Sequence, residues 1–119
     1  MKQVIFDTNC LLYAIEKRID PFEAVQRMFD EPIEVLVPEG VVNELKAMAG
    51  KKTKEALFAS AALKLIKAKG IEAAPSEGPV DKWITDYAAK RNAVVCTYDR
   101  QLRKNLKKLG VKGITLKRR

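Results

Sequence analysis

Two acidic residues of this sequence each follow a short apolar stretch. Val4–Phe6 leads directly into Asp7, and Val94–Thr97 is followed, one residue later, by Asp99. Each stretch is typical of a short buried strand. In open parallel α/β sheets, ligands bind just outside the carboxyl ends of the strands. If these two strands are neighbours, the carboxylates meet at one site, and clustered carboxylates either hold protons or gather cations.

Helical spacing adds two further acids to this predicted site. At about 100° per residue, Glu44 lies at the edge of an apolar helical stripe, beside Met48. Asp81 lies in the first turn of a later helix. A helix that follows a parallel strand starts at the carboxyl edge of the sheet, so both acids are expected to project toward the edge that carries the two strand-end acids.

Three of the four acids also have a purely structural explanation. Asp99 could serve only as a helix cap, a role that Asp fills well. Asp81 could be a first-turn acid favoured by the helix dipole. Glu44 could be a half-exposed surface residue paired with a lysine. Asp7 directly follows an apolar strand, and the pattern offers no cap or dipole explanation for it.

The composition narrows the chemistry. The chain has no histidine, which excludes Ser-His-Asp, Cys-His and histidine-ligated metal sites. Cys10 and Cys96 lack the spacing of a zinc site, and we expect them to be free core cysteines of a reducing cytoplasm. Oxygen ligands alone favour hard ions, which indicates Mg²⁺ or Mn²⁺.

Length and charge set further expectations. The 119 residues predict a single domain over 1–119. The 23 Lys and Arg against 15 Asp and Glu give a net charge of +8, which favours nucleic acid as a partner. The apolar stretches are far shorter than the roughly 20 residues that span a bilayer, and no signal peptide is recognised. We therefore expect a cytoplasmic protein without a membrane segment.

Strands and helices alternate along the chain. Helices are expected from about residues 11 to 18, 20 to 29, 38 to 50, 51 to 70, 80 to 90 and 99 to 110, the fourth with Leu57, Ala61, Leu65 and Ala68 on its apolar stripe. Alternation of this kind indicates a parallel sheet with helices on both faces. The expected strands are Val4–Phe6, Val35–Val37, a weak Ile71–Ala73, Ala93–Thr97 and Gly113–Leu116.

These motifs in this order resemble those of the PIN-domain ribonucleases, over nearly the whole chain. They are Asp7-Thr8-Asn9 after the first strand, Val41–Leu45 after the second, Asp81 with Ile84, and Thr97-Tyr98-Asp99 after the fourth. The resemblance implies a three-layer α/β/α sandwich with a parallel five-stranded sheet in the order 3-2-1-4-5. Strands one and four are then neighbours.

The resemblance also implies an activity. It implies a divalent-metal-dependent endoribonuclease that hydrolyses phosphodiester bonds in single-stranded or loop RNA, with one or two Mg²⁺ or Mn²⁺ ions. The implied partners are RNA, a protein antitoxin or an RNA-processing partner, and a second copy of the chain. The implied catalytic and metal-binding residues are Asp7, Glu44, Asp81 and Asp99, with Asn9 and Thr97 in support of the metal site.

Basic residues surround the predicted site. One side of the last helix, opposite its leucines, carries Arg100, Lys104, Lys107 and Lys108, and Arg103 extends this patch. A basic rim around an acidic pocket is what binding of a phosphate backbone needs. Lys51, Lys52 and Lys54 and the tail Lys117–Arg119 extend this charge. The residues expected to bind RNA are Arg100, Arg103, Lys104 and Lys107.

Two other readings stay open. The chain could be a catalytically inactive module of the same fold that binds RNA or assembles with other proteins. A phosphoacceptor domain of the receiver type is also a parallel α/β unit of this length. Receivers need an adjacent pair of acids after the first strand, and this chain has Asp7-Thr8 there, which disfavours that reading.

Overall fold

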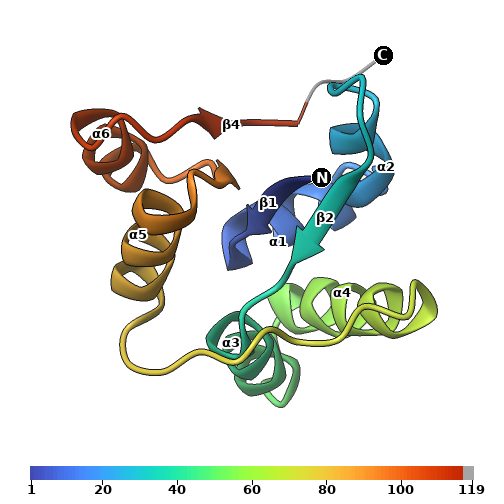
Figure 1. The fold of residues 1–119 in the computed structure, drawn as a ribbon. Helices are drawn as coiled ribbons and strands as arrows, with labels where there is room; N and C mark the ends of the chain where they lie inside the picture. Colours follow the sequence, from blue (N-terminus) through green and yellow to red (C-terminus); the bar gives the residue numbers. More distant parts are fainter. Residues whose placement is uncertain (117–119) are drawn as a thin grey trace.

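A computed structural model describes residues 1–116, in which four parallel strands form a sheet with helices on both faces (Figure 1). The predicted basic tail Lys117–Arg119 lies outside the described residues. None of the helices within residues 1–116 has the length and apolarity needed to cross a membrane. The elements are β1 (Lys2–Phe6), α1 (Thr8–Glu16), α2 (Pro21–Gln26), β2 (Ile33–Leu36), α3 (Glu39–Ala49), α4 (Lys54–Ala68), α5 (Val80–Arg91), β3 (Val94–Cys96), α6 (Arg100–Lys108) and β4 (Gly113–Ile114).

The strands lie in the order β2-β1-β3-β4, and every pair is parallel. Val4 of β1 is level with Val35 of β2 on one side and with Val94 of β3 on the other. Phe6 is level with Cys96. The expectation that the first strand and the strand before Thr97 are neighbours is therefore confirmed.

The predicted third strand, Ile71–Ala73, is wrong. In the described residues this segment makes only an isolated parallel bridge, between Pro38 and Ala74. The bridge consists of two hydrogen bonds, from the Ala74 N–H to the Val37 carbonyl and from the Glu39 N–H to the Ala74 carbonyl, each 2.8 Å long, and it stops where α3 begins at Glu39. Within residues 1–116 the sheet thus has four strands rather than five, and these four keep the relative order that was predicted for them.

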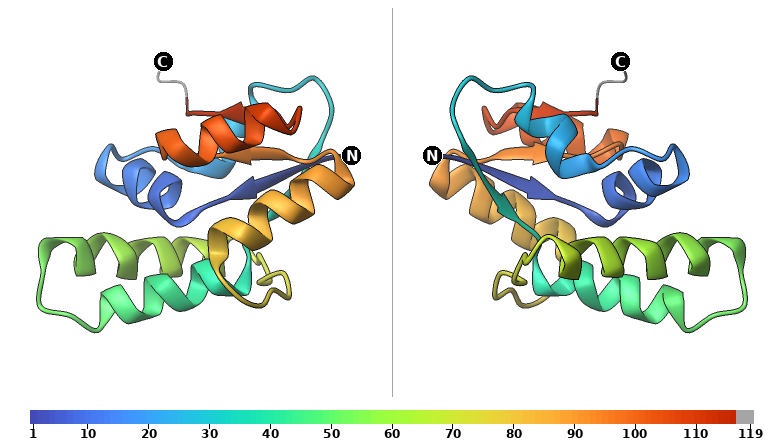
Figure 2. Two further views of the ribbon diagram at one scale, coloured as in Figure 1. Left: turned by 90° about the vertical axis from the view of Figure 1, so that its left-hand side faces the viewer. Right: turned by 90° about the vertical axis from the view of Figure 1, so that its right-hand side faces the viewer.

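Side chains of β1 alternate between two cores. Val4 and Phe6 point to the face covered by α1 to α4, whereas Ile5 points to the face covered by α5 and α6. All three side chains are fully buried, and each contributes about 1.5–3 kcal/mol by leaving water. The two views of Figure 2 show the helices on either side of the strands. The predicted three layers follow from this alternation.

Helix α4 buries a different stripe from the one predicted. Leu57 is 72% exposed, and Ala68 is exposed as well. Small side chains face α3 and α1 instead, which permits close packing of the helices, and the larger leucine stays outside. The buried residues of α4 are Ala56, Ala59, Ala62 and Ile66.

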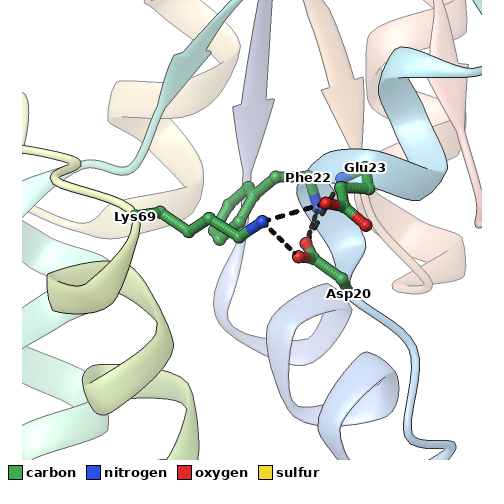
Figure 3. Close-up of polar contacts among 4 residues, drawn as sticks. All are labelled: Asp20, Phe22, Glu23 and Lys69. Carbon is green, nitrogen blue, oxygen red and sulfur yellow. Dashed lines mark hydrogen bonds and ion pairs between the residues drawn. The ribbon is translucent and has the colours of Figure 1, made fainter.

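The beginning of α2 is tied to the end of α4 (Figure 3). Asp20 is the N-cap of α2, and its side chain accepts from the backbone N–H groups of Phe22 at 3.0 Å and Glu23 at 3.2 Å. The Nζ of Lys69 lies 2.6 Å from Asp20 Oδ2 and 3.2 Å from Glu23 Oε1. Asp20 thus caps α2, close to the predicted start of this helix at residue 20, and one lysine joins the cap to the neighbouring helix.

The first turns of α3 and α5 lie very close together. A Cβ atom placed on Gly40 would be 2.8 Å from Val80 Cγ2. The backbone N–H of Gly40 donates to Ser76 Oγ at 2.9 Å, and the Ser76 N–H donates to Glu39 Oε1 at 3.1 Å. These contacts hold the segment before α5 against the start of α3, and so bring the helices of Glu44 and Asp81 together.

Candidate active site

Asp7 is buried at the carboxyl end of β1, with 4% of its surface exposed. It is the N-cap of α1, and its Oδ1 accepts from the Cys10 N–H at 2.9 Å. Its Oδ2 accepts from the Thr97 hydroxyl. The expectation that Asp7 has no capping role is therefore wrong, because α1 begins at the very next residue.

Asp99 has the same local role at the start of α6. It is the N-cap of that helix, and its Oδ1 accepts from the Leu102 N–H at 3.0 Å. The predicted cap at Asp99 is confirmed. Unlike Asp7, this residue is only partly buried.

Thr97 links the two strand-end acids. It is fully buried; its hydroxyl donates to Asp7 and accepts from the Asp99 N–H at 3.0 Å. Asn9 Oδ1 accepts from the N–H of Tyr98 at 3.0 Å, which fixes the peptide between Thr97 and Asp99. The residues expected to support the site thus connect α1 to the loop that follows β3.

The two helix acids lie at the exposed rim. Glu44 of α3 is exposed, and its Oε1 accepts from the hydroxyl of Thr8. Asp81 lies in the first turn of α5 and is exposed as well. Sequence reasoning did not assign a role to Thr8; its place directly after Asp7, at the first position of α1, is the only signal that pointed to it.

The acids influence one another electrostatically. Burial raises the pKa of Asp7 from its ordinary value of 3.8 to about 6; the hydrogen bonds from Thr97 and Cys10 oppose this rise, and the charges of Asp81 and Asp99 add to it. Desolvation and the charges of Asp99 and Glu44 raise the pKa of Asp81. All four acids are therefore connected through their charges, with Asp81 as the common neighbour.

The types of side chain at this edge fit a hard cation, since all four are carboxylates. Ion pairs in the described part of the chain join Lys69 to Asp20 and Glu23, and Lys82 to Asp86, so none neutralises the four acids. Within residues 1–116, no three His, Cys, Asp or Glu side chains lie close enough to hold a metal ion as they are placed. The carboxylate side chains fit a hard cation by type, and they would have to move toward one another to coordinate it.

A basic groove of about 510 Å³ runs between α6 and β4. Arg100 follows Asp99 directly, so the groove begins beside the acidic edge. The four residues expected to bind RNA all line it. Sequence reasoning missed the other lining residues, Val111, Lys112 and Gly113, which come from the turn into β4.

Two thiols lie beneath the acids. The Sγ atoms of Cys10 and Cys96 are 2.6 Å apart, both residues are fully buried, and both are free. Burial and the hydrogen bond to Cys96 raise the pKa of the Cys10 thiol well above its usual range. The expectation of free core cysteines is confirmed.

Comparisons with known proteins agree on one fold. A family model described as a PIN-like domain matches residues 4–119. The PIN domain endonuclease Utp24 superposes with a TM-score of 0.80 at 21% identity, covering 98% of this chain and 86% of that one. A domain of a functionally unknown protein from Methanocaldococcus jannaschii superposes with a TM-score of 0.68 at 21% identity, covering 100% and 94%.

A third solved structure shares the fold as well. VapBC2 from Rickettsia felis, bound to a DNA fragment from its promoter, superposes with a TM-score of 0.67 at 18% identity, covering 97% of this chain and 99% of that one. No curated protein sequence matches this chain. The structural likeness at these identities concerns the fold.

Proposed function

Because this chain belongs to the PIN-like domain family, we propose that it is a divalent-metal-dependent endoribonuclease that hydrolyses phosphodiester bonds in single-stranded or loop RNA. The observation that carries this proposal is the set of four acids at the carboxyl edge of the sheet. Burial and negative neighbours raise the pKa of Asp7 there, and a cation would relieve both effects. The fold shared with the PIN domain endonuclease Utp24 supports the same class of reaction.

The proposed ligands of the ion are Asp7, Glu44, Asp81 and Asp99, for one or two Mg²⁺ or Mn²⁺ ions. Carboxylates without histidine or thiolate ligands favour these hard cations over zinc. When bound, such an ion supplies Lewis acidity at the phosphate and lowers the pKa of the attacking water. The chain has no histidine, so the proposal assigns no histidine base to that water.

The neighbouring residues would orient the acids. The Thr97 hydroxyl contacts the carboxylate of Asp7 and the backbone of Asp99, so one buried side chain sets the relative position of both. Thr8 holds Glu44 from the first position of α1. Because such outer contacts keep ligands in the reactive arrangement, we expect Thr8 and Thr97 to affect the rate without contacting RNA.

The basic groove is the proposed path of the RNA backbone. Arg100, Arg103 or Lys104, and Lys107 follow at helical spacing along α6, and seven residues at about 1.5 Å each extend over roughly 10 Å. That length corresponds to about three nucleotide steps along the axis of a stacked strand, at about 3.4 Å per step. Lys112 lines the same groove from the β4 side, and none of its lining residues within 1–116 is acidic. The track begins next to Asp99, where the scissile phosphate would lie.

Cleavage of RNA tests the proposed activity. The purified protein should cut a fluorogenic single-stranded RNA with Mg²⁺ or Mn²⁺ and stop when EDTA is added. Asp7→Asn should abolish cutting, whereas Asp86→Asn should not, because Asp86 is exposed and paired with Lys82 on the same helix as Asp81. Cleavage that persists in EDTA, or that survives Asp7→Asn, would rule the mechanism out.

Binding of RNA tests the groove separately. In the Asp7→Asn background with EDTA, a double substitution Lys104→Glu/Lys107→Glu should weaken binding of a labelled single-stranded RNA at least 10-fold and reduce its salt dependence. The matched control Lys64→Glu/Lys67→Glu makes the same change of charge on the exposed side of α4. Equal weakening by both pairs would mean that net charge alone, rather than the groove, attracts RNA.

The biological partner would separate two roles. A toxin should arrest growth when expressed and be neutralised by a small antitoxin protein, as expected from the VapBC-type fold match. An RNA-processing nuclease should instead copurify with a defined RNA or RNA–protein particle. A homodimer in the cytoplasm is compatible with either role, and light scattering of the purified protein would detect the dimer.

A catalytically inactive RNA-binding or assembly module is the second candidate. The observation that favours it is the spacing of the acids, since no three of them enclose an ion in the described residues. It predicts RNA binding that Mg²⁺ does not change, and no cleavage. This module could still hold the metal, so cleavage of RNA with Mg²⁺ or Mn²⁺ separates the candidates, because only the nuclease proposal expects it.

A further inference from the structure

We propose that Cys10 and Cys96 form an intramolecular disulfide on oxidation and that this bond clamps α1 to β3 directly beneath Asp7. Their sulfur atoms lie 2.6 Å apart in the structure, in which both cysteines are free. Neither residue has a part in the proposed hydrolysis, so this inference stands independently of it.

Backbone groups of both cysteines form hydrogen bonds with Asp7. The N–H of Cys10 donates to Asp7 Oδ1 at 2.9 Å, and the N–H of Asp7 donates to the carbonyl of Cys96 at 3.3 Å. The two cysteines therefore hold Asp7 from both sides. A disulfide between their side chains would covalently join the two residues that form hydrogen bonds with Asp7.

The surroundings limit other outcomes of oxidation. Both cysteines are 0% exposed, and they are the only two cysteines in the chain. Intermolecular pairing would require one of them to leave the core. A small hydroperoxide can reach buried thiols that a bulky oxidant cannot reach, so the proposed oxidant is a small hydroperoxide.

The reaction balances with a hydroperoxide. One thiol is oxidised to a sulfenic acid, and the hydroperoxide is reduced and releases water or an alcohol. The second sulfur then attacks the first, the S–S bond forms, the S–O bond breaks, and water leaves. Two thiols together lose two electrons and two protons.

The expected effect is stabilisation. The cysteines are 86 positions apart in the sequence, so the bond closes a long loop and removes much entropy from the unfolded chain. The oxidised protein should melt roughly 10 °C above the reduced protein. A cross-link that joins a helix to a strand of the central sheet should act on global unfolding.

Hydrogen peroxide treatment of the folded wild-type protein tests the proposal. Intact mass should fall by about 2 Da, digestion without reductant should yield the linked peptides of Cys10 and Cys96, and Tm should rise until dithiothreitol reverses it. Cys96→Ala should show no Tm difference between peroxide and dithiothreitol, which makes the control independent of its own stability. Size-exclusion chromatography should show unchanged size.

Three results would overturn the proposal. They are an unchanged mass with two reactive thiols after unfolding, a gain of oxygen atoms on separate cysteines, and a disulfide-linked dimer. A linked pair with unchanged Tm would overturn the clamp. Because each readout is mass or melting, none depends on whether the protein cleaves RNA.

Discussion

Asp7 and Asp99 begin their helices in the same way, yet their environments differ. Each is an N-cap whose carboxylate accepts from the N–H three residues later. Asp7 directly follows the last residue of β1 and is buried, whereas Asp99 comes three residues after β3 and is partly exposed. A shared local motif thus sets the cap, and the distance from the sheet sets how strongly burial acts on the charge.

Loss of activity should be the largest effect, and it should not distinguish the two acids. If both bind the metal, Asp7→Asn and Asp99→Asn should each lower kcat/KM at least about 100-fold, because loss of an outer partner of a metal ligand alone costs about 10–100-fold. Steady-state cleavage of a short RNA measures this. An Asp99→Asn variant with full activity would reduce that residue to a helix cap.

Stability should separate the two acids. The folded protein holds Asp7 with a pKa of about 6 against an ordinary 3.8, so at pH 7 its ionisation costs the metal-free fold about 2–3 kcal/mol. Asp7→Asn should therefore raise the free energy of unfolding in EDTA by up to that amount. Asp99→Asn should change it by less than about 0.5 kcal/mol, because Asn caps helices as well as Asp does. Urea unfolding at pH 7 measures both.

The raised pKa of Asp7 determines the pH range over which the stability of the wild type differs from that of Asp7→Asn. Between about pH 4 and pH 6 the folded state binds more protons at Asp7 than the unfolded state does, so stability falls as the pH rises through this range. The difference between wild type and Asp7→Asn should vanish near pH 4 and be complete above pH 6. A difference that grows toward low pH would contradict the raised pKa.

Removing the link between the two acids should have a smaller effect. Thr97→Val deletes the hydroxyl that donates to Asp7 and accepts from the Asp99 N–H. We expect a loss of about 1–3 kcal/mol in the free energy of unfolding and a further rise in the pKa of Asp7. Thr85→Val is the control, since its hydroxyl donates only to the carbonyl one turn back in α5. Equal losses of stability in Thr97→Val and Thr85→Val would show that the Thr97 hydroxyl between Asp7 and Asp99 contributes no more than a hydroxyl on the helix surface.

The smallest expected effect tests the electrostatic contact between the acids. Asp81→Asn should lower the pKa of Asp7, because the charge of Asp81 contributes to raising it. Carboxyl carbon shifts followed by NMR in EDTA report this pKa directly. Asp86→Asn on the same helix should leave it unchanged. A shift of the same size in both variants would mean that Asp81 is no nearer to Asp7 than Asp86 is.

Local signals predicted the parts of this fold that local physics decides. The start of the helix near residue 20 and the end of the helix near residue 90 were predicted, and each depends on neighbouring residues only: Asp20 caps the first, and the left-handed Asn92 ends the second. The order of the neighbouring strands followed from the family resemblance. The site edge followed from strand ends, since parallel strands share a direction.

Other parts depend on contacts distant in sequence. In α4, leucines and alanines alternate closely enough that two stripes look apolar, and only the packing against α3 and α1 selects the alanines. The hydrogen bond from Thr8 to Glu44 joins residues 36 positions apart. The groove needed Lys112 from the turn into β4, which no pattern in α6 reveals.

Gly40 shows how the distance between Glu44 on α3 and Asp81 on α5 is maintained. Its backbone does not have the positive φ that favours glycine, so a side chain is excluded by volume rather than by conformation. Val80 is β-branched and stiff within its helix, and it cannot turn away from an added methyl group. The size of the residue at position 40 therefore sets the distance between α3 and α5. Each larger residue there would move α5, and Asp81 with it, farther from α3.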